Sequence, residues 1–255
     1  MPSLYYCLIV LCGLFVPFNT YADENQKEVI IAVSGSSKPY VFDNGKGLII
    51  DVITEALAHS GHRSHFIRLN NQSAIEQFNQ NKFDALAISN QSISKGYRSE
   101  PYITFNNMAI SLAQKGYTIN SLDDLANKRI TAFPAAHKYL GPELSTAINT
   151  FDSYHETKSQ KEQVELLVNN ETDVVISDRL IFKYHLQQLL YESRYSGKYL
   201  HKITYYPIFS PNHYRAVFHD PALRDDFNKG LLHLQKSGRM EELEKYYQIL
   251  INQYG

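Results

Sequence analysis

Short apolar runs rich in β-branched residues alternate with segments of helical periodicity along most of this 255-residue chain, and this alternation limits its possible folds more than any other feature. The runs at 29–33 and 173–177 have the length and composition of buried strands. In residues 47–58 the apolar side chains recur at the spacing of a helix with one buried face. Strands that alternate with helices are typical of α/β folds with parallel strands, so the sequence predicts an α/β protein.

The same patterns place the other expected elements. Strands are predicted at 65–69, 83–88 and 129–133, and helices at 73–81, 161–169, 221–236 and 240–247, with a further helix from about Ala136. A helix start is also predicted at Ser121, whose hydroxyl is expected to cap the amide of Asp124 while that carboxylate reaches back. Two β-rich segments at 108–113 and 214–218 are candidates for crossings into a second lobe and back.

The first 22 residues have the features of a secretory leader. They contain no charged side chain, and their apolar run at 8–16 is far shorter than the roughly 20 residues that span a bilayer. Thr20 and Ala22 place small residues at the two positions that a signal peptidase reads. The sequence therefore predicts a signal peptide at 1–22, cleavage after Ala22 and a periplasmic location. Because the leader has no Lys or Arg, a membrane anchor is the alternative interpretation.

Composition excludes several kinds of chemistry. Cys7 and Cys12 are the only cysteines and both lie in the leader, so the mature chain is expected to have neither a disulfide nor a thiol site. The 25 basic and 26 acidic residues form no block of one sign, which argues against nucleic acid or an anionic membrane as the main partner.

Motifs for metals, cofactors and hydrolytic catalysis are not evident. His59, His62 and His65 recur every three residues, but Gly61 interrupts the helix that would bring them to one face. The chain has no Gly-x-Ser-x-Gly motif. We therefore expect no metal and no cofactor.

A series of short motifs resembles, in the same order, those of the periplasmic solute-binding proteins of the polar amino-acid type, family 3. The resemblance implies a two-lobed type II periplasmic-binding-protein fold with two hinge strands and a small molecule bound between the lobes. It places lobe 1 at 23–109 and 215–255, and lobe 2 at 110–214. The motifs are KPYVF at 38–42, GLIIDV at 47–52, KFDALAIS at 82–89, SEPY at 99–102, SLDDL at 121–125, TDVVISD at 172–178 and the segments at 227–231, 236–240 and 246–247.

The resemblance also implies two charged ligand contacts. Asp178 follows the strand of lobe 2 at the position where the family binds the ligand's ammonium group; the alternative is a helix cap for the segment that begins at Leu180. The family's carboxylate-binding arginine has no direct counterpart, because the matching position holds Tyr97. Arg98, one residue later, is the candidate, and an exposed loop arginine is the alternative interpretation.

Polar residues at the ends of strands are the other candidates in lobe 1. Ser89, Asn90, Gln91 and Ser92 follow a buried strand, and ligands of open α/β sheets bind at such strand ends. The family's stacking aromatic before the first proline is replaced by serines, so Ser37 and Tyr40 are the candidates in that loop.

In lobe 2, residues 133–137 stand where the family has a Gly-Thr-Thr-like turn at a helix start. The amides there, including that of Ala136, are expected to contact an anion, with His137 as an additional donor. A lone histidine is more often a surface residue, and that alternative stays open.

The resemblance implies a non-enzymatic, monomeric binding protein that captures a small polar, amine-bearing solute for a membrane permease. A competing hypothesis is a periplasmic enzyme similar to cyclohexadienyl dehydratase, with Glu100, Asp178 or His137 as general acid or base. A third is a stand-alone sensory binding module that acts through a partner.

Overall fold

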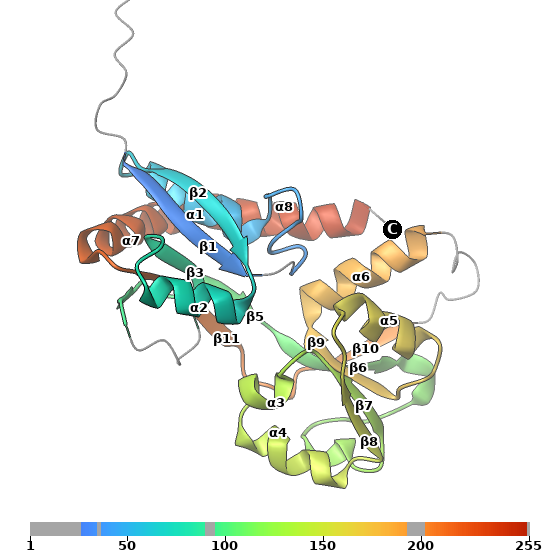
Figure 1. Cartoon of the computed structure of the whole chain (residues 1–255). Coiled ribbons are helices and arrows are strands. Elements are labelled where there is room, and N and C mark those ends of the chain that lie inside the picture. Colours follow the sequence, from blue (N-terminus) through green and yellow to red (C-terminus); the bar gives the residue numbers. More distant parts are fainter. Residues whose placement is uncertain (1–26, 35–36, 90–94, 193–201, 254–255) are drawn as a thin grey trace, which may run out of the picture.

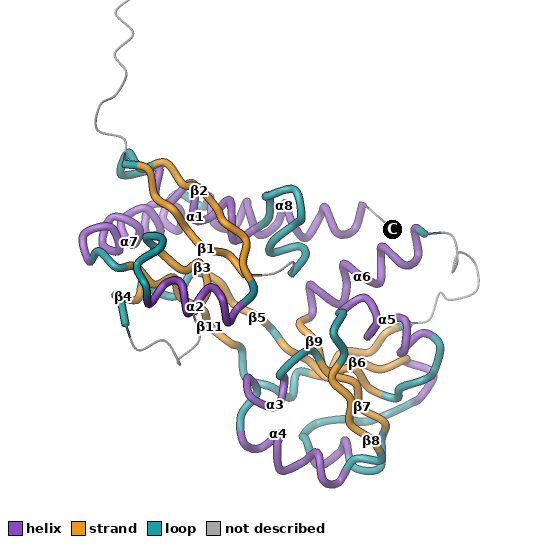
Figure 2. The backbone as a smooth tube through the Cα atoms, in the orientation of Figure 1, coloured by secondary structure: helices purple, strands orange, loops and turns teal. Residues whose placement is uncertain are grey.

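Two α/β lobes, each built on its own sheet, make up the protein (Figure 1, Figure 2). The computed structural model describes residues 27–34, 37–89, 95–192 and 202–253. The predicted leader and the candidate contacts Asn90, Gln91 and Ser92 lie outside the described residues.

The sheet of the first lobe has the strand order β2-β1-β3-β11-β4, and β5 also pairs with β11. Strands β2 and β3 are parallel to β1, whereas β11 is antiparallel to β3. The strands are β1 (Glu28–Ser34), β2 (Arg63–Leu69), β3 (Ala85–Ser89), β4 (Tyr97–Arg98), β5 (Ile103–Phe105) and β11 (Asn212–Phe218).

Helices cover both faces of this sheet. Val29, Ile31 and Val33 of β1 belong to one apolar cluster with three of the helices, and Ala32 belongs to a second cluster with the other helix. Burial on both faces explains most of the apolar run of β1, although Ile30 within it is 39% exposed. The helices of the first cluster are α1 (Leu48–Ala58), α7 (Pro221–Lys236) and α8 (Arg239–Gln253), and the helix of the second is α2 (Asn71–Asn79).

The sheet of the second lobe has the order β10-β6-β9-β7-β8. One apolar cluster lies under the two short helices and another under the two longer ones. Its strands are β6 (Asn107–Leu112), β7 (Arg129–Ala132), β8 (Ser153–Glu156), β9 (Val174–Asp178) and β10 (Ile203–Tyr206). Its helices are α3 (Ala136–Tyr139), α4 (Pro142–Ala147), α5 (Gln160–Val168) and α6 (Arg179–Tyr191), with 3₁₀ turns at Ala113–Lys115, Asp123–Leu125 and Ile148–Thr150.

The chain crosses between the lobes twice, between β5 and β6 and between β10 and β11. The two segments expected to cross, 108–113 and 214–218, instead lie in the second and the first lobe. The chain passes from β5 directly into β6, where Asn107 already pairs with Asp178 of the second sheet. It returns from β10 into β11, where Asn212 pairs with Phe105 of the first sheet. Both β6 and β11 run antiparallel to their neighbours. Each sheet is therefore mixed, not wholly parallel as the alternation alone predicted.

The segment at Ser121 differs in detail from the expectation. The carboxylate of Asp124 does reach back, accepting hydrogen bonds from the amides of Asn120 (2.9 Å) and Ser121 (3.0 Å). The Ser121 hydroxyl donates a hydrogen bond to this carboxylate. It does not cap the backbone amide of Asp124, as was expected. The segment consequently forms a single 3₁₀ turn, Asp123–Leu125, and no longer helix. Within the described part of the chain, none of the helices has the length and apolar character of a membrane span.

Candidate functional site

The carboxyl ends of three parallel strands of the second sheet lie where the chain enters from the first lobe. Ala132 at the end of β7 pairs with Glu156 of β8 and with Ile176 of β9, so the three strands end at the same edge. Asn107, the first residue of β6, pairs with Asp178 at that edge. In open α/β sheets ligands bind outside the carboxyl ends of the strands. This edge is therefore the candidate site.

Asp178 is buried at this edge, with 3% of its surface exposed. Its carboxylate caps α6 by accepting hydrogen bonds from the amides of Leu180 (2.9 Å) and Ile181 (3.1 Å), and it also accepts one from the amide of Asn106 (2.8 Å). The Tyr40 hydroxyl donates a fourth, longer bond at 3.3 Å. Asp178 is thus a helix cap, as one of its two interpretations predicted, and it also binds a side chain of the other lobe.

Tyr40 reaches Asp178 from the loop that follows β1. Its ring is 1% exposed and packs edge-on against Phe105, with the ring centroids 4.3 Å apart. Phe105 in turn packs edge-on against Tyr214 at 5.0 Å. Burial, followed by the nearby charge of Asp178, raises the pKa of Tyr40 well above its usual value, so its hydroxyl stays protonated and able to donate. Aromatic rings from both crossings therefore surround the contact between the lobes.

Helix α6 belongs to the second lobe but also packs on the first. Ile181 is part of the apolar cluster of α1, α7 and α8, and Leu180 packs against it. Tyr184 meets Phe42 of the first lobe edge-on at 5.6 Å. The helix that Asp178 caps thus carries apolar contact between the lobes.

Burial raises the pKa of Asp178 from 3.8 to about 6, against the opposing hydrogen bonds from the three amides and Tyr40. Between these two values the folded chain binds more protons than the unfolded chain. The stability that the protonation of Asp178 contributes is therefore complete below its unfolded pKa of 3.8. It is lost as pH rises through its folded pKa of about 6.

We expect Asp178→Asn to remove this pH dependence. Urea unfolding is measured for both proteins between about pH 4 and pH 7. As pH rises, the free energy of unfolding of the wild type should fall relative to that of the variant, by at most about 1.4 kcal/mol per pH unit. A difference between the two proteins that stays constant across this range would contradict the assignment.

A second carboxylate, that of Glu156, is enclosed by the turn before α3. It accepts hydrogen bonds from the amides of Ala135 (2.8 Å) and His137 (3.1 Å), from Nδ1 of His137 (2.7 Å) and from the Tyr154 hydroxyl (2.7 Å). Ala135 has a left-handed backbone with φ 60°, which residues other than glycine rarely adopt. The amide of Ala136 is engaged by the carbonyl of Phe133 at 3.1 Å. A carboxylate of the protein itself therefore occupies the turn where the sequence predicted an external anion.

Burial alone would raise the pKa of Glu156, but the bonds from the side chain and amide of His137, from Tyr154 and from Ala135 outweigh it and lower the pKa to about 2. Glu156 is consequently ionised at neutral pH.

Arg98 lies away from the edge formed by β7, β8 and β9. It is in β4, an outer strand of the first sheet, where it pairs with Val217 (Figure 2). Its side chain is exposed, and its carbonyl accepts a hydrogen bond from Arg224 of α7 at 3.2 Å. Ser37 forms a turn in which its carbonyl accepts the amide of Tyr40 at 2.7 Å. Ser89 ends β3 and pairs with Arg215 of β11.

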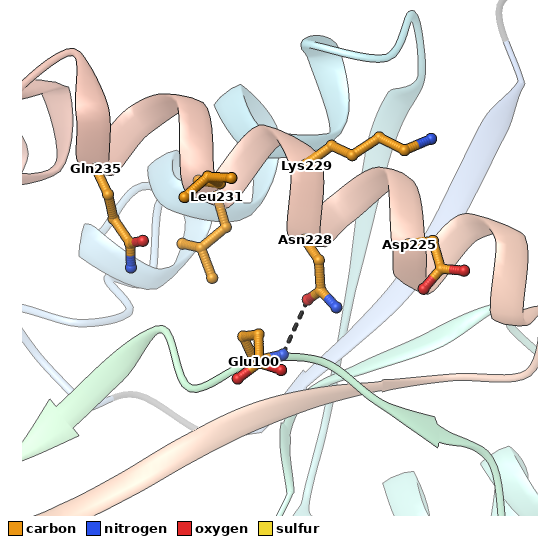
Figure 3. A pocket seen from close by; sticks show the side chains of 7 residues that line it. Glu100, Asp225, Asn228, Lys229, Leu231 and Gln235 are labelled. Carbon is orange, nitrogen blue, oxygen red and sulfur yellow. Dashed lines mark hydrogen bonds between the residues drawn. The ribbon is translucent and has the colours of Figure 1, made fainter.

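Glu100, the third candidate acid of the enzyme hypothesis, faces α7 on the first lobe. It lines a pocket of about 510 Å³ beside that helix, and its amide donates to Asn228 at 2.9 Å (Figure 3). Its side chain is 71% exposed. Glu100 is thus in a different lobe from Asp178 and His137, and the three do not form one acid–base group. The pocket is lined by Glu100, Asp225, Asn228, Lys229, Leu231, Leu232 and Gln235.

Sequence reasoning did not identify Glu156, Tyr154, Phe105 or Tyr214. Glu156 and Tyr154 lie in β8, a half-exposed strand without an apolar run, so periodicity did not reveal it. The aromatic residues flank the crossings, and they gain their role only when β5 pairs with β11. Among the described residues, no group of three or more potential metal ligands comes together.

The comparison with protein families decides the family. Residues 29–249 match the model of bacterial extracellular solute-binding proteins, family 3. The chain belongs to this family. The match covers both lobes and confirms the resemblance read from the motifs.

Several solved structures are similar to this chain over most of its length. The ligand-binding core of GluR0 in complex with L-glutamate has a TM-score of 0.67 at 19% identity, covering 88% of this chain and 99% of that chain. The ancestral amino acid-binding protein AncCDT-1, a precursor of cyclohexadienyl dehydratase, has 0.66 at 16%, covering 86% and 95%. An ABC uptake transporter substrate-binding protein from Streptococcus pneumoniae with bound histidine has 0.66 at 14%, covering 86% and 92%.

These likenesses confirm the two-lobed type II fold, and family membership supports a solute-binding role. A search of curated proteins found no match to the sequence.

Proposed function

We propose that this family 3 protein captures a small polar, amine-bearing solute between its lobes and delivers it to a membrane permease, without catalysing a reaction. The observation that carries the proposal is the carboxylate of Asp178, which lies at the carboxyl end of β9 and is contacted by a hydroxyl from the opposite lobe. A carboxylate in a largely dry site forms charge-assisted hydrogen bonds, which are stronger than neutral ones.

The bond from Tyr40 is the one that a solute can replace. The three amides hold Asp178 at 2.8 to 3.1 Å, whereas the Tyr40 hydroxyl lies at 3.3 Å from one carboxylate oxygen and 3.4 Å from the other. In our proposal a solute ammonium takes the position of this hydroxyl. Because Tyr40 and Asp178 belong to different lobes, the exchange couples binding to the way the lobes meet.

Location and partner follow from the proposal. The neutral, apolar run at 8–16 and the small residues before Asp23 support export through a cleaved leader. A balanced charge of 25 basic and 26 acidic residues suits a small-molecule cargo and no nucleic acid. The proposed partner is a permease that recognises the form with bound solute, and the proposed state is a monomer.

We expect one class of amine to raise the melting temperature by about 5 °C or more, at a concentration about 100 times its dissociation constant. The measurement is a thermal-shift screen of the mature chain against amino acids, amines, opines and neutral sugars. Asp178→Asn should weaken binding of the responding amine about tenfold or more, because it removes the charge from the acceptor.

Asp220→Asn is the matched control, since Asp220 caps the outer helix α7 through the amide of Ala222 at 2.8 Å and is far more exposed. The Asp220→Asn variant should bind the responding amine with the same affinity as the wild type. A response to a neutral sugar with none to any amine would disprove the role of Asp178. Turnover of prephenate or arogenate would instead support the enzyme hypothesis.

A further inference from the structure

Glu156 and Asp178 place two carboxylates at one edge of the second sheet. Ala132 of β7 pairs with Glu156 on one side and with Ile176 on the other, and Asp178 lies two residues beyond Ile176. Strand β7 separates the two acidic strands, and neighbouring strands are about 4.8 Å apart, so the two backbones are about 10 Å apart. A solute held at Asp178 therefore lies within reach of the charge on Glu156.

The turn before α3 has no amide left for a solute's carboxylate. The amides of Ala135 and His137 both donate to Glu156, and the amide of Ala136 donates to the carbonyl of Phe133. The ring of His137 also points its Nδ1 at Glu156, and the Tyr154 hydroxyl donates a fourth bond. A carboxylate accepts about four hydrogen bonds in its plane, so Glu156 satisfies this group of donors completely.

The two basic side chains of the first lobe near Tyr40 are both held by one carboxylate of that lobe. Lys38 pairs with Asp43 at 2.6 Å, and Arg68 pairs with the same carboxylate at 3.1 Å. Arg98, the residue expected to bind a carboxylate, is on the outer strand β4. The carboxylates of Glu156 and Asp178 lie at the edge itself, and each repels a solute carboxylate placed there.

We infer that the site selects organic cations without a carboxylate, namely amines and guanidines, over the corresponding amino acids. Glu156 is the residue that sets this selectivity. The inference rests on the proposed function. Glu156 acts in two ways: it occupies the donors that an amino acid's carboxylate needs, and it adds a negative charge that favours a cation. The proposal does not require a new pocket, because it concerns the same edge that holds Asp178.

The test compares pairs of solutes that differ only in the α-carboxylate. Isothermal titration calorimetry of the mature chain is carried out with agmatine and arginine, with cadaverine and lysine, and with putrescine and ornithine. We expect the compound without the carboxylate to bind at least about tenfold more tightly in the responding pair. Tighter binding of the amino acid would overturn this inference while leaving the proposed function intact. Binding of no compound from any pair would overturn both.

A variant assigns the selectivity to Glu156. Glu156→Gln keeps the shape and one acceptor oxygen but removes the charge, and we expect it to reduce the affinity ratio within the pair by about fivefold or more. Glu162→Gln, an exposed position of α5 in the same lobe, should leave the ratio unchanged. An unchanged ratio in folded Glu156→Gln would show that Glu156 does not set the selectivity. The wild-type ratio alone still tests the solute class if this variant does not fold.

Discussion

Asp178→Ala is expected to lower the free energy of unfolding by about 4 kcal/mol. The substitution removes the cap of α6 and leaves the amides of Asn106, Leu180 and Ile181 without an acceptor at a position that is 3% exposed. Asp178 accepts four hydrogen bonds, from these three amides and from the Tyr40 hydroxyl, and each contributes about 1 kcal/mol. Urea unfolding at about pH 5, below the folded pKa of Asp178, measures the loss by circular dichroism.

The control for this prediction is Asp220→Ala. Asp220 also caps a helix, through the amide of Ala222, but its side chain is 45% exposed and its other partner, Lys27, is also in the first lobe. Water replaces the lost acceptor there, so we expect a loss of only about 1 kcal/mol. Equal losses for the two variants would mean that the bonds to Asn106 and Tyr40 do not stabilise the protein.

Gly230→Val is expected to destabilise the protein by at least about 3 kcal/mol. Gly230 lies in α7 at its closest approach to α1, and a Cβ atom there would be 1.9 Å from the carbonyl oxygen of Ala56. The obstacle is backbone, so a change of rotamer cannot remove it and the two helices must move apart. Thermal and urea unfolding should both show the loss.

Leu232→Val is the control for Gly230→Val. It introduces the same residue two positions later in α7, where the side chain is 49% exposed. We expect a change within about 0.5 kcal/mol, since an exposed substitution away from special contacts has little effect. A small effect of both variants would contradict the close packing of α1 on α7.

The local pattern of side chains predicted the central strands of the sheets well and the edge strands poorly. Strands β3 and β9 are buried on both faces, and β1 and β7 over most of their length, so these strands leave apolar runs in the sequence. Strands β8 and β10 lie at the two edges of the second sheet and are only half buried, so no such run marks them. Helix α3 was predicted at its start, but its length of four residues was not.

The candidate site was predicted only in part. Asp178 was identified through the order of motifs and its place at the end of a buried strand. Its role as a helix cap is confirmed. Its role as a ligand contact remains a proposal. Its partner Tyr40 is 138 residues away, and no local pattern connects the two. Glu156 was missed because its four hydrogen bonds come from a turn and a strand that only the folded second lobe brings together.

The sequence by itself determined the α/β class and the family, because burial of strands and helix faces leaves periodic apolar patterns and because short motifs persist in a common order. Only the tertiary structure decided which groups meet at the edge of the second sheet: Tyr40 with Asp178, and the turn at Ala135 with Glu156. The physical reason is that hydrogen bonds between distant segments depend on strand order and register, which no short stretch of residues specifies.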